Sequence, residues 1–284
     1  MNRILFSLCL LPSFLIGGPV LQVRNFDDLP QVFAKLNPIR TFVFLDVDDL
    51  AIIPNSSLGS VAWFKELKNL LVEYKVPEEQ ADRIRSDIWD FGLRHTSFSS
   101  PSEPLMETLG YLRSREFSVL GVTRRSIAFA NVLPEHLRSL GCDFVSFLPS
   151  FLRISHLLSP RDPRAIWTQG LLFAGSLPIS EALEKFVANV SIPLNSTVCI
   201  SFDREFLNEC HSYFSKKKSS SISVMLTPEN AQNVSIENAE MQILSLNLSS
   251  TDAETHRPQP LSGISYTRED VLRKMRDIWS LCSG

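Results

Sequence analysis

Three short, predominantly apolar runs constrain the fold of this chain more than any other feature of its sequence. They cover residues 41–45, 117–122 and 197–202, and each is rich in β-branched or aromatic side chains. A strand that is apolar on both faces suits a parallel sheet covered by helices on both sides, whereas a half-exposed strand alternates apolar with polar residues. The sequence therefore predicts an α/β fold built on a Rossmann-like parallel sheet.

The segments between these runs have helical periodicity, as an α/β fold requires. Residues 58–98 carry apolar side chains three and four positions apart, and Pro77 is placed to open a second helix within them. We interpret this stretch as a two-helix insertion that forms a small helical cap. Residues 19–57 and 99–284 are then expected to form the α/β core.

Two more segments of the core have strand character. Residues 167–174 are expected to form a hairpin that turns at Gln169 and Gly170. Residues 241–246 are interpreted as a further strand within an otherwise polar connection. A closing helix is expected near the end of the chain.

Residues 1–18 have the features of a secretory signal peptide. Arg3 gives a short positive region, an apolar stretch follows, and Gly17 and Gly18 supply small residues at its end. The apolar stretch is too short to span a bilayer comfortably. The alternative is a buried strand or helix, but the uniform apolar character favours export to the periplasm or the medium. No transmembrane helix is expected after signal removal.

Charge and cysteine content exclude some functions and leave others open. The formal net charge of -3 gives no basic footprint for nucleic acid. No CxxC or zinc-like spacing occurs. An exported protein can form disulfides, whereas a thiol in a buried strand packs as a small apolar group, so the pairing of the cysteines stays open. Four cysteines follow the signal segment: Cys142, Cys199, Cys210 and Cys282.

Polar residues stand where each of the three apolar runs ends. Asp46 and Asp48 follow the first run, Thr123 the second and Asp203 the third. Because parallel strands bring their carboxyl ends to one edge, where ligands bind in open α/β sheets, these side chains are expected to converge. Like charges at a core boundary need a cation, hydrogen bonds or water beside them. The plainer alternative is a set of strand-ending turns and helix caps.

These strand ends resemble the motifs of the haloacid dehalogenase-like (HAD) superfamily of phosphohydrolases. Asp46-Val47-Asp48 is similar to its first motif, residues 119–123 to its second and residues 198–203 to its fourth, and the helical insertion falls where that superfamily places a cap. The resemblance covers residues 30–214. The stretches near residues 103–124 and 170–174 also resemble a poorly characterised bacterial family of exported HAD-like proteins of unknown function.

The resemblance implies a role for each matching residue. Asp46 would be the nucleophile that forms an aspartyl-phosphate, and Asp48 would act as general acid and base. Thr123 and Arg124 would bind the phosphoryl group. Mg²⁺ would be held by Asp46, Asp203 and the backbone carbonyl of Asp48, since it prefers oxygen ligands. The substrate would be a small phosphorylated molecule.

Departures from the motifs weaken this implied activity. Ile179 stands where the superfamily has a lysine, Phe202 stands where it often has an acid, and Asp49 adds a third acid to the first motif. Losing one preorganised cationic contact typically costs about 2–4 kcal/mol of transition-state stabilisation. Candidates to replace the missing charge are Arg124, Arg125 and Lys185. Two functions therefore stay open: a slow Mg²⁺-dependent phosphatase, or a catalytically inactive relative that binds an unknown protein partner.

Overall fold

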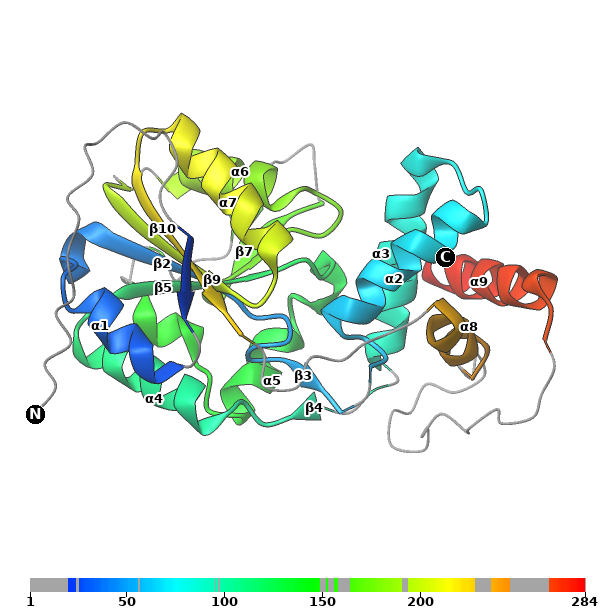
Figure 1. Ribbon diagram of the computed structural model, residues 1–284, viewed down its shortest axis with the longest axis horizontal. Helices are drawn as coiled ribbons and strands as arrows, with labels where there is room; N and C mark the ends of the chain where they lie inside the picture. The colour runs from blue at the N-terminus through cyan, green and yellow to red at the C-terminus, as the bar shows by residue number, and fades with distance from the viewer. Residues whose placement is uncertain are drawn as a thin grey trace, which may run out of the picture.

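The computed structural model shows a helix-covered sheet with a separate group of helices beside it (Figure 1). The structure describes residues 20–23, 26–55, 57–94, 96, 98–148, 152, 156–157, 164–190, 194–227, 236–245 and 266–283. The predicted signal peptide, residues 1–18, lies outside this part of the chain. Export therefore stays a prediction.

The described residues form one large sheet with strand order β1-β10-β9-β2-β5-β8-β7-β6. The strands are β1 (Val20–Val23), β2 (Thr41–Asp46), β5 (Ser118–Thr123), β6 (His156–Leu157), β7 (Ile166–Thr168), β8 (Leu171–Phe173), β9 (Ser196–Ser201) and β10 (Ser220–Leu226). In this sheet order, every pair of neighbouring strands between β1 and β8 is parallel. In the large sheet, only the β8–β7 and β7–β6 pairs at one edge are antiparallel. The predicted α/β class with a Rossmann-like parallel sheet is confirmed.

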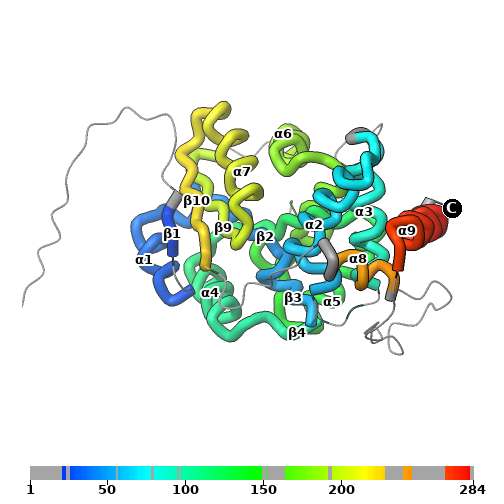
Figure 2. The backbone as a smooth tube through the Cα atoms, turned by 45° about the vertical axis from the view of Figure 1, so that its right-hand side comes forward, coloured from blue at the N-terminus to red at the C-terminus, as the bar shows by residue number. Residues whose placement is uncertain are grey.

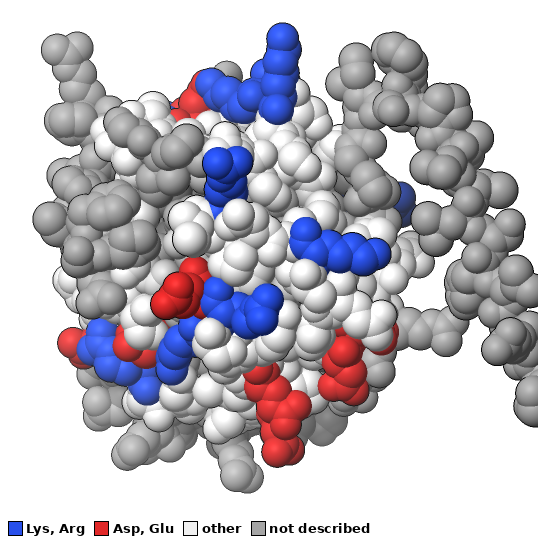
Figure 3. All heavy atoms as spheres, turned by 90° about the vertical axis from the view of Figure 1, so that its left-hand side faces the viewer, with Lys and Arg blue, Asp and Glu red and all other residues white. Residues whose placement is uncertain are grey.

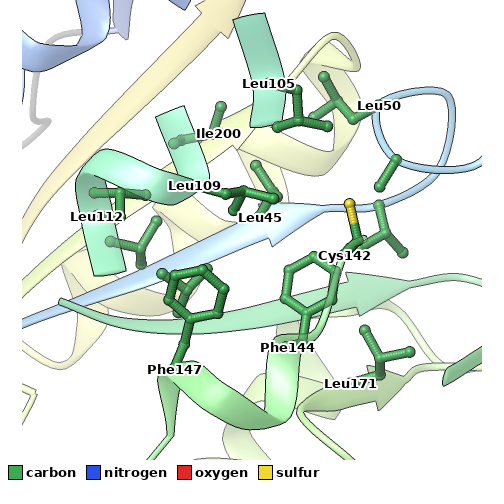
Figure 4. Close-up of a cluster of buried hydrophobic side chains, with 14 of the residues drawn as sticks. Leu45, Leu50, Leu105, Leu109, Leu112, Cys142, Phe144, Phe147, Leu171 and Ile200 are labelled. Atoms are coloured by element: carbon green, nitrogen blue, oxygen red, sulfur yellow. The ribbon is translucent and has the colours of Figure 1, made fainter. Parts of the chain in front are cut away.

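Helices cover both faces of the sheet and enclose two apolar cores. The helices over the first core are α1 (Leu29–Phe33), α4 (Glu103–Ser114) and α5 (Leu133–Ser139), and those over the second are α6 (Ile179–Val190) and α7 (Arg204–Lys216). Short 3-10 turns are η1 (Phe26–Asp28), η2 (Pro38–Arg40), η3 (Ile127–Phe129) and η4 (Phe144–Phe147). Figure 4 shows Leu105, Leu109 and Leu112 of α4 over Leu45 of β2. Burial on both faces explains why the central strands are predominantly apolar.

The helices beside the sheet form a third apolar core of their own, and we call them the helical layer. It consists of α2 (Val61–Glu73), α3 (Glu78–Arg94), α8 (Ile236–Ser245) and α9 (Arg268–Ser283). Ala239, Ile243, Val271, Met275 and Ile278 pack with apolar residues of α2 and α3. Figures 1 and 2 both show α8 and α9 beside α2 and α3. The layer is therefore larger than the expected cap of residues 58–98, because the end of the chain, assigned to the core from sequence, completes it.

The strand expected at residues 241–246 is wrong for residues 241–245, which belong to α8, and residue 246 lies outside the described residues. Ala239 and Ile243 are four positions apart and both fully buried in the helical layer, which is helical spacing. The Glu240 carboxylate accepts a hydrogen bond from the hydroxyl of Tyr74, the residue that caps the C-terminal end of α2. A short apolar run does not distinguish helix from strand by itself, and here the packing against α2 decides.

The expected hairpin is confirmed, with β7 and β8 paired across Gln169 and Gly170. Both turn residues have positive φ, 48° and 80°. A Cβ on Gly170 would lie 2.6 Å from the carbonyl carbon of Phe144, so glycine is required by close packing as well as by conformation.

Two short strands join the core to the helical layer. β3 (Ile53–Pro54) precedes α2 and β4 (Phe98–Ser99) follows α3, and they pair as an antiparallel ribbon. The chain thus enters and leaves this part of the layer at one place.

The charge of one face and the state of the cysteines are also visible in the structure. Figure 3 shows basic side chains in blue and acidic side chains in red on the same face, so that face carries charges of both signs. Cys142, Cys199 and Cys210 are buried free thiols, and the side chain of Cys282 lies outside the described part. Within the described ranges, no helix has the length and apolar character to cross a membrane.

Candidate functional site

The strand-end residues predicted from sequence come together at the carboxyl edge of the sheet. β2 lies between β9 and β5, with Leu45 opposite Ile200 and Asp46 opposite Val122. This register places Asp46, Asp48, Thr123, Arg124 and Asp203 at one edge. Thr123 is fully buried, and the three aspartates are between 1% and 5% exposed.

Asp46 ends β2 and is held by neutral donors. The Ser201 hydroxyl donates to Oδ2 at 2.6 Å, and the backbone N–H of Asp48 donates to Oδ1 at 3.2 Å. Burial, followed by the charge of Asp48, raises the pKa of Asp46 well above its ordinary value, although Arg124 opposes the shift. Among the described residues, no Lys or Arg forms a salt bridge with this carboxylate. The environment therefore favours its neutral form.

Asp48 is engaged by three groups from the end of β5. The Thr123 hydroxyl lies 2.9 Å from Oδ2 and the backbone N–H of Arg124 lies 3.0 Å from the same oxygen. Nε of Arg125 forms an ion pair with Oδ1 at 2.8 Å. The Arg125 side chain is 1% exposed and stacks 4.6 Å above the ring of Trp89 in α3. Asp48 is thus the buried counter-ion of a buried arginine.

Asp203 caps α7 and is paired with two cations. Its Oδ1 accepts from the backbone N–H of Glu205 at 3.0 Å. Nζ of Lys65, from α2 of the helical layer, lies 2.5 Å from Oδ1, and Nη1 of Arg124 lies 3.0 Å from Oδ2. Burial alone would raise the pKa of Asp203, but Arg124 and Lys65 together hold it below its ordinary value.

Three contributors to this site were not identified as such from sequence. No local sequence pattern indicated a role in the site for Lys65 or Ser201, because each contacts an aspartate that is distant in the chain. Arg125 was only a candidate replacement cation, whereas Lys185, offered for the same role, lies 3.5 Å from Glu181 in its own helix. We call the resulting set the charged cluster; its members are Asp46, Asp48, Asp203, Lys65, Arg124 and Arg125.

Two further carboxylates border the charged cluster, the partly buried Asp49 and the buried Asp90. Asp49 has a φ of 59°, and its Oδ2 accepts from the backbone N–H of Val61 at 2.9 Å, so it helps to begin α2. Burial is the main cause that raises its pKa to about 7. Asp90 of α3 interacts with Ser126 and Arg125, and burial raises its pKa to about 6. The third acid of the first motif therefore has a structural role.

The charged cluster in this arrangement does not fit Mg²⁺. Both oxygens of Asp203 face cations of the chain itself, and both oxygens of Asp48 are engaged by Thr123, Arg124 and Arg125. Within the described ranges, no group of three metal-ligating side chains is placed to hold an ion. Mg²⁺ needs several oxygen ligands that are free to face it. The expected magnesium site stays a prediction that this geometry does not support.

The chain is thus an α/β protein with a helical layer. At the carboxyl edge of its sheet, buried aspartates are paired with basic side chains of the same chain. Comparison with known families assigns it further: a family model described as "Protein of unknown function (DUF2608)" matches residues 22–245. The match covers most of the chain, so the protein belongs to this family. Among curated proteins, no match is found.

This finding corrects the resemblance to the HAD superfamily. The family model that matches is DUF2608, a family of unknown function, and no HAD family model matches. The roles that the resemblance implied for Asp46, Asp48 and Asp203 therefore have to be judged on the geometry of the site alone.

Proposed function

We propose that this protein is a catalytically inactive binding protein in which internal ion pairs occupy the carboxylates that metal-dependent phosphohydrolysis would require. One observation carries the proposal: Asp203 is paired with both Lys65 and Arg124, while Asp48 is paired with Arg125. A divalent ion would have to displace the positive side chains that already compensate these acids, and the displaced Arg125 is itself buried and would lose its counter-ion.

The protonation and contacts of the two candidate catalytic acids also favour this proposal. A carboxylate attacks phosphorus only when it is ionised, yet burial raises the pKa of Asp46 and favours its neutral form. A general acid must reach the leaving group, yet both oxygens of Asp48 already face Thr123, Arg124 or Arg125. Each acid is therefore poorly prepared for the role that the motif would give it.

The low exposure of the site also supports the proposal that the protein is catalytically inactive. The Asp46 residue is 1% exposed, so a substrate does not reach it in this conformation. A binding protein of this kind would take a small phosphorylated molecule or a protein partner elsewhere on its surface. We propose that it does so after export, as the sequence of residues 1–18 indicates.

The test is hydrolysis of a generic aryl phosphate by the purified protein, with and without Mg²⁺, beside the Asp46→Asn variant. The expected result is that both proteins are equally inert and that Mg²⁺ leaves their melting temperatures unchanged. A thermal-shift screen of phosphorylated small molecules on the same protein then searches for a ligand. Metal-dependent turnover that disappears in Asp46→Asn would contradict the proposal.

A second candidate is slow phosphomonoester hydrolysis with Asp46 as the nucleophile. The observation that favours it is that Asp46, unlike Asp48 and Asp203, has no salt bridge within the described ranges. Thr123 and Arg124 lie at the end of the neighbouring strand, where they would contact a phosphoryl group. The same turnover assay separates this candidate from the first.

A further inference from the structure

We propose that Lys65, Asp203 and Arg124 form a latch that keeps the helical layer closed over Asp46, and that breaking the latch opens the layer. The three side chains come from both parts of the molecule. Lys65 belongs to α2 of the helical layer, whereas Asp203 and Arg124 follow strands of the core. Their ion pair therefore joins two structural units.

The contacts of the latch are short and converge on one carboxylate. Nζ of Lys65 lies 2.5 Å from Oδ1 of Asp203, and Nη1 of Arg124 lies 3.0 Å from Oδ2. Nη2 of Arg124 also reaches Glu209 at 3.4 Å, which anchors this arginine to α7 on the core side. Lys65 is thus the member of the latch that moves with the helical layer.

The exposure of these side chains explains how the latch can be broken. The Lys65 side chain is 44% exposed, whereas that of Asp203 is 4% exposed. Dissolved ions can therefore reach the lysine, and salt weakens an ion pair with an exposed partner. Asp46 is 1% exposed in the closed arrangement, and we expect its exposure to rise when α2 moves away.

The packing of the helical layer allows it to move as a unit. Its apolar core is formed by residues of α2, α3, α8 and α9, separate from the two cores of the sheet, and Phe98 and Phe129 are partly buried at the border. The β3–β4 ribbon holds together the points where the chain enters α2 and leaves α3. Opening about this ribbon would keep the internal packing of the layer intact.

Besides the latch, other contacts join the two parts. Arg125 stacks on Trp89 of α3, Arg94 of α3 lies 5.7 Å from the ring centre of Phe129, and Asp90 of α3 interacts with Ser126. Arg125 also pairs with Asp48, so it stays with the core when the layer opens. These contacts therefore limit the motion but do not replace the ion pair at Asp203.

The test compares amide hydrogen exchange in Lys65→Met and Lys68→Met. Lys68 is an exposed residue on the same helix, so its variant removes the same charge without touching the latch. We expect exchange of the amides of Val61 and Glu205, which are bonded to Asp49 and Asp203, to become about tenfold faster in Lys65→Met. Tenfold corresponds to about 1.4 kcal/mol. Lys68→Met and the amides of β10 should be unaffected.

A salt titration gives a second readout that needs no destabilising variant. Raising the ionic strength of the wild type from about 0.1 M to about 1 M should speed exchange at Val61 and Glu205, because the screening length falls from about 10 Å to about 3 Å. Lys65→Arg, which keeps the charge, should behave as the wild type. Equal exchange in Lys65→Met and Lys68→Met, or a salt effect spread evenly through β10, would overturn the latch.

Discussion

Replacing Asp90 by Asn is expected to stabilise the protein at neutral pH and to have little effect in acid. Asp90 is buried in α3 beside Arg125 and Ser126, and one of its oxygens has no hydrogen-bond partner. Burial raises its pKa from 3.8 to about 6 despite the opposing charge of Arg125. Asn keeps the shape and hydrogen-bonding capacity of the side chain but has no charge to bury.

The sign and size of the effect follow from the shift in pKa. Between the two pKa values the folded protein keeps a proton that the unfolded chain has released, so the wild type loses stability as the pH rises through this window. A shift of about two units corresponds to about 3 kcal/mol in the free energy of unfolding. The gain in the free energy of unfolding of Asp90→Asn over the wild type should therefore be near its minimum at about pH 4 and reach its full size above about pH 7.

Urea unfolding followed by tryptophan fluorescence measures this difference at both pH values. The matched control is Glu107→Gln, which removes an exposed carboxylate from α4 and should shift stability by a similar small amount at each pH. A difference between wild type and Asp90→Asn that is the same at both pH values would contradict this prediction, because it would show that folding does not raise the pKa of Asp90.

Other substitutions test the fold. Ile243→Ala should lower the free energy of unfolding in urea by about 2–5 kcal/mol, because Ile243 is fully buried in the helical layer; an unchanged value would show that α8 does not pack there. Gly170→Ala should lower the melting temperature, because its φ is 80° and the added Cβ would meet Phe144; a melting temperature equal to that of the wild type would contradict this turn geometry. Ser60→Ala should cost about 1 kcal/mol, since the Ser60 hydroxyl caps α2 at the Trp63 N–H, and Ser60→Asp should restore most of it in the same urea assay.

The strands and the convergence of the acids could be predicted because both depend on local pattern and general topology. Residues 41–45 and 117–122 are predominantly apolar, as burial on both faces of the sheet favours. Once these strands are parallel, Asp46 and Thr123 must end at the same edge. The hairpin at Gln169 and Gly170 was predictable for a similar local reason, since its turn requires positive φ.

The secondary structure of the segment now seen as α8 could not be predicted in the same way. Residues 241–246 were expected to form a strand, but residues 241–245 belong to α8 because Ile243 packs in the helical layer. The partners of Ile243 in α2 and α3 lie more than a hundred residues earlier in the chain. A short apolar run supplies no information about such distant partners, so its secondary structure depends on the packing that only the complete fold provides.

The positions of the acids at the strand ends follow from the sequence, whereas the positive charges that balance them depend on the tertiary structure. Asp203 follows its strand wherever that strand is placed, but Lys65 is 138 residues away from it in the chain and meets it only because α2 folds over the strand ends. The energy of an ion pair depends on the distance between the charges and on their burial, and sequence separation reveals neither. The expected metal ion was inferred from the acids alone, whereas in the folded protein Arg124, Arg125 and Lys65 supply the positive charge.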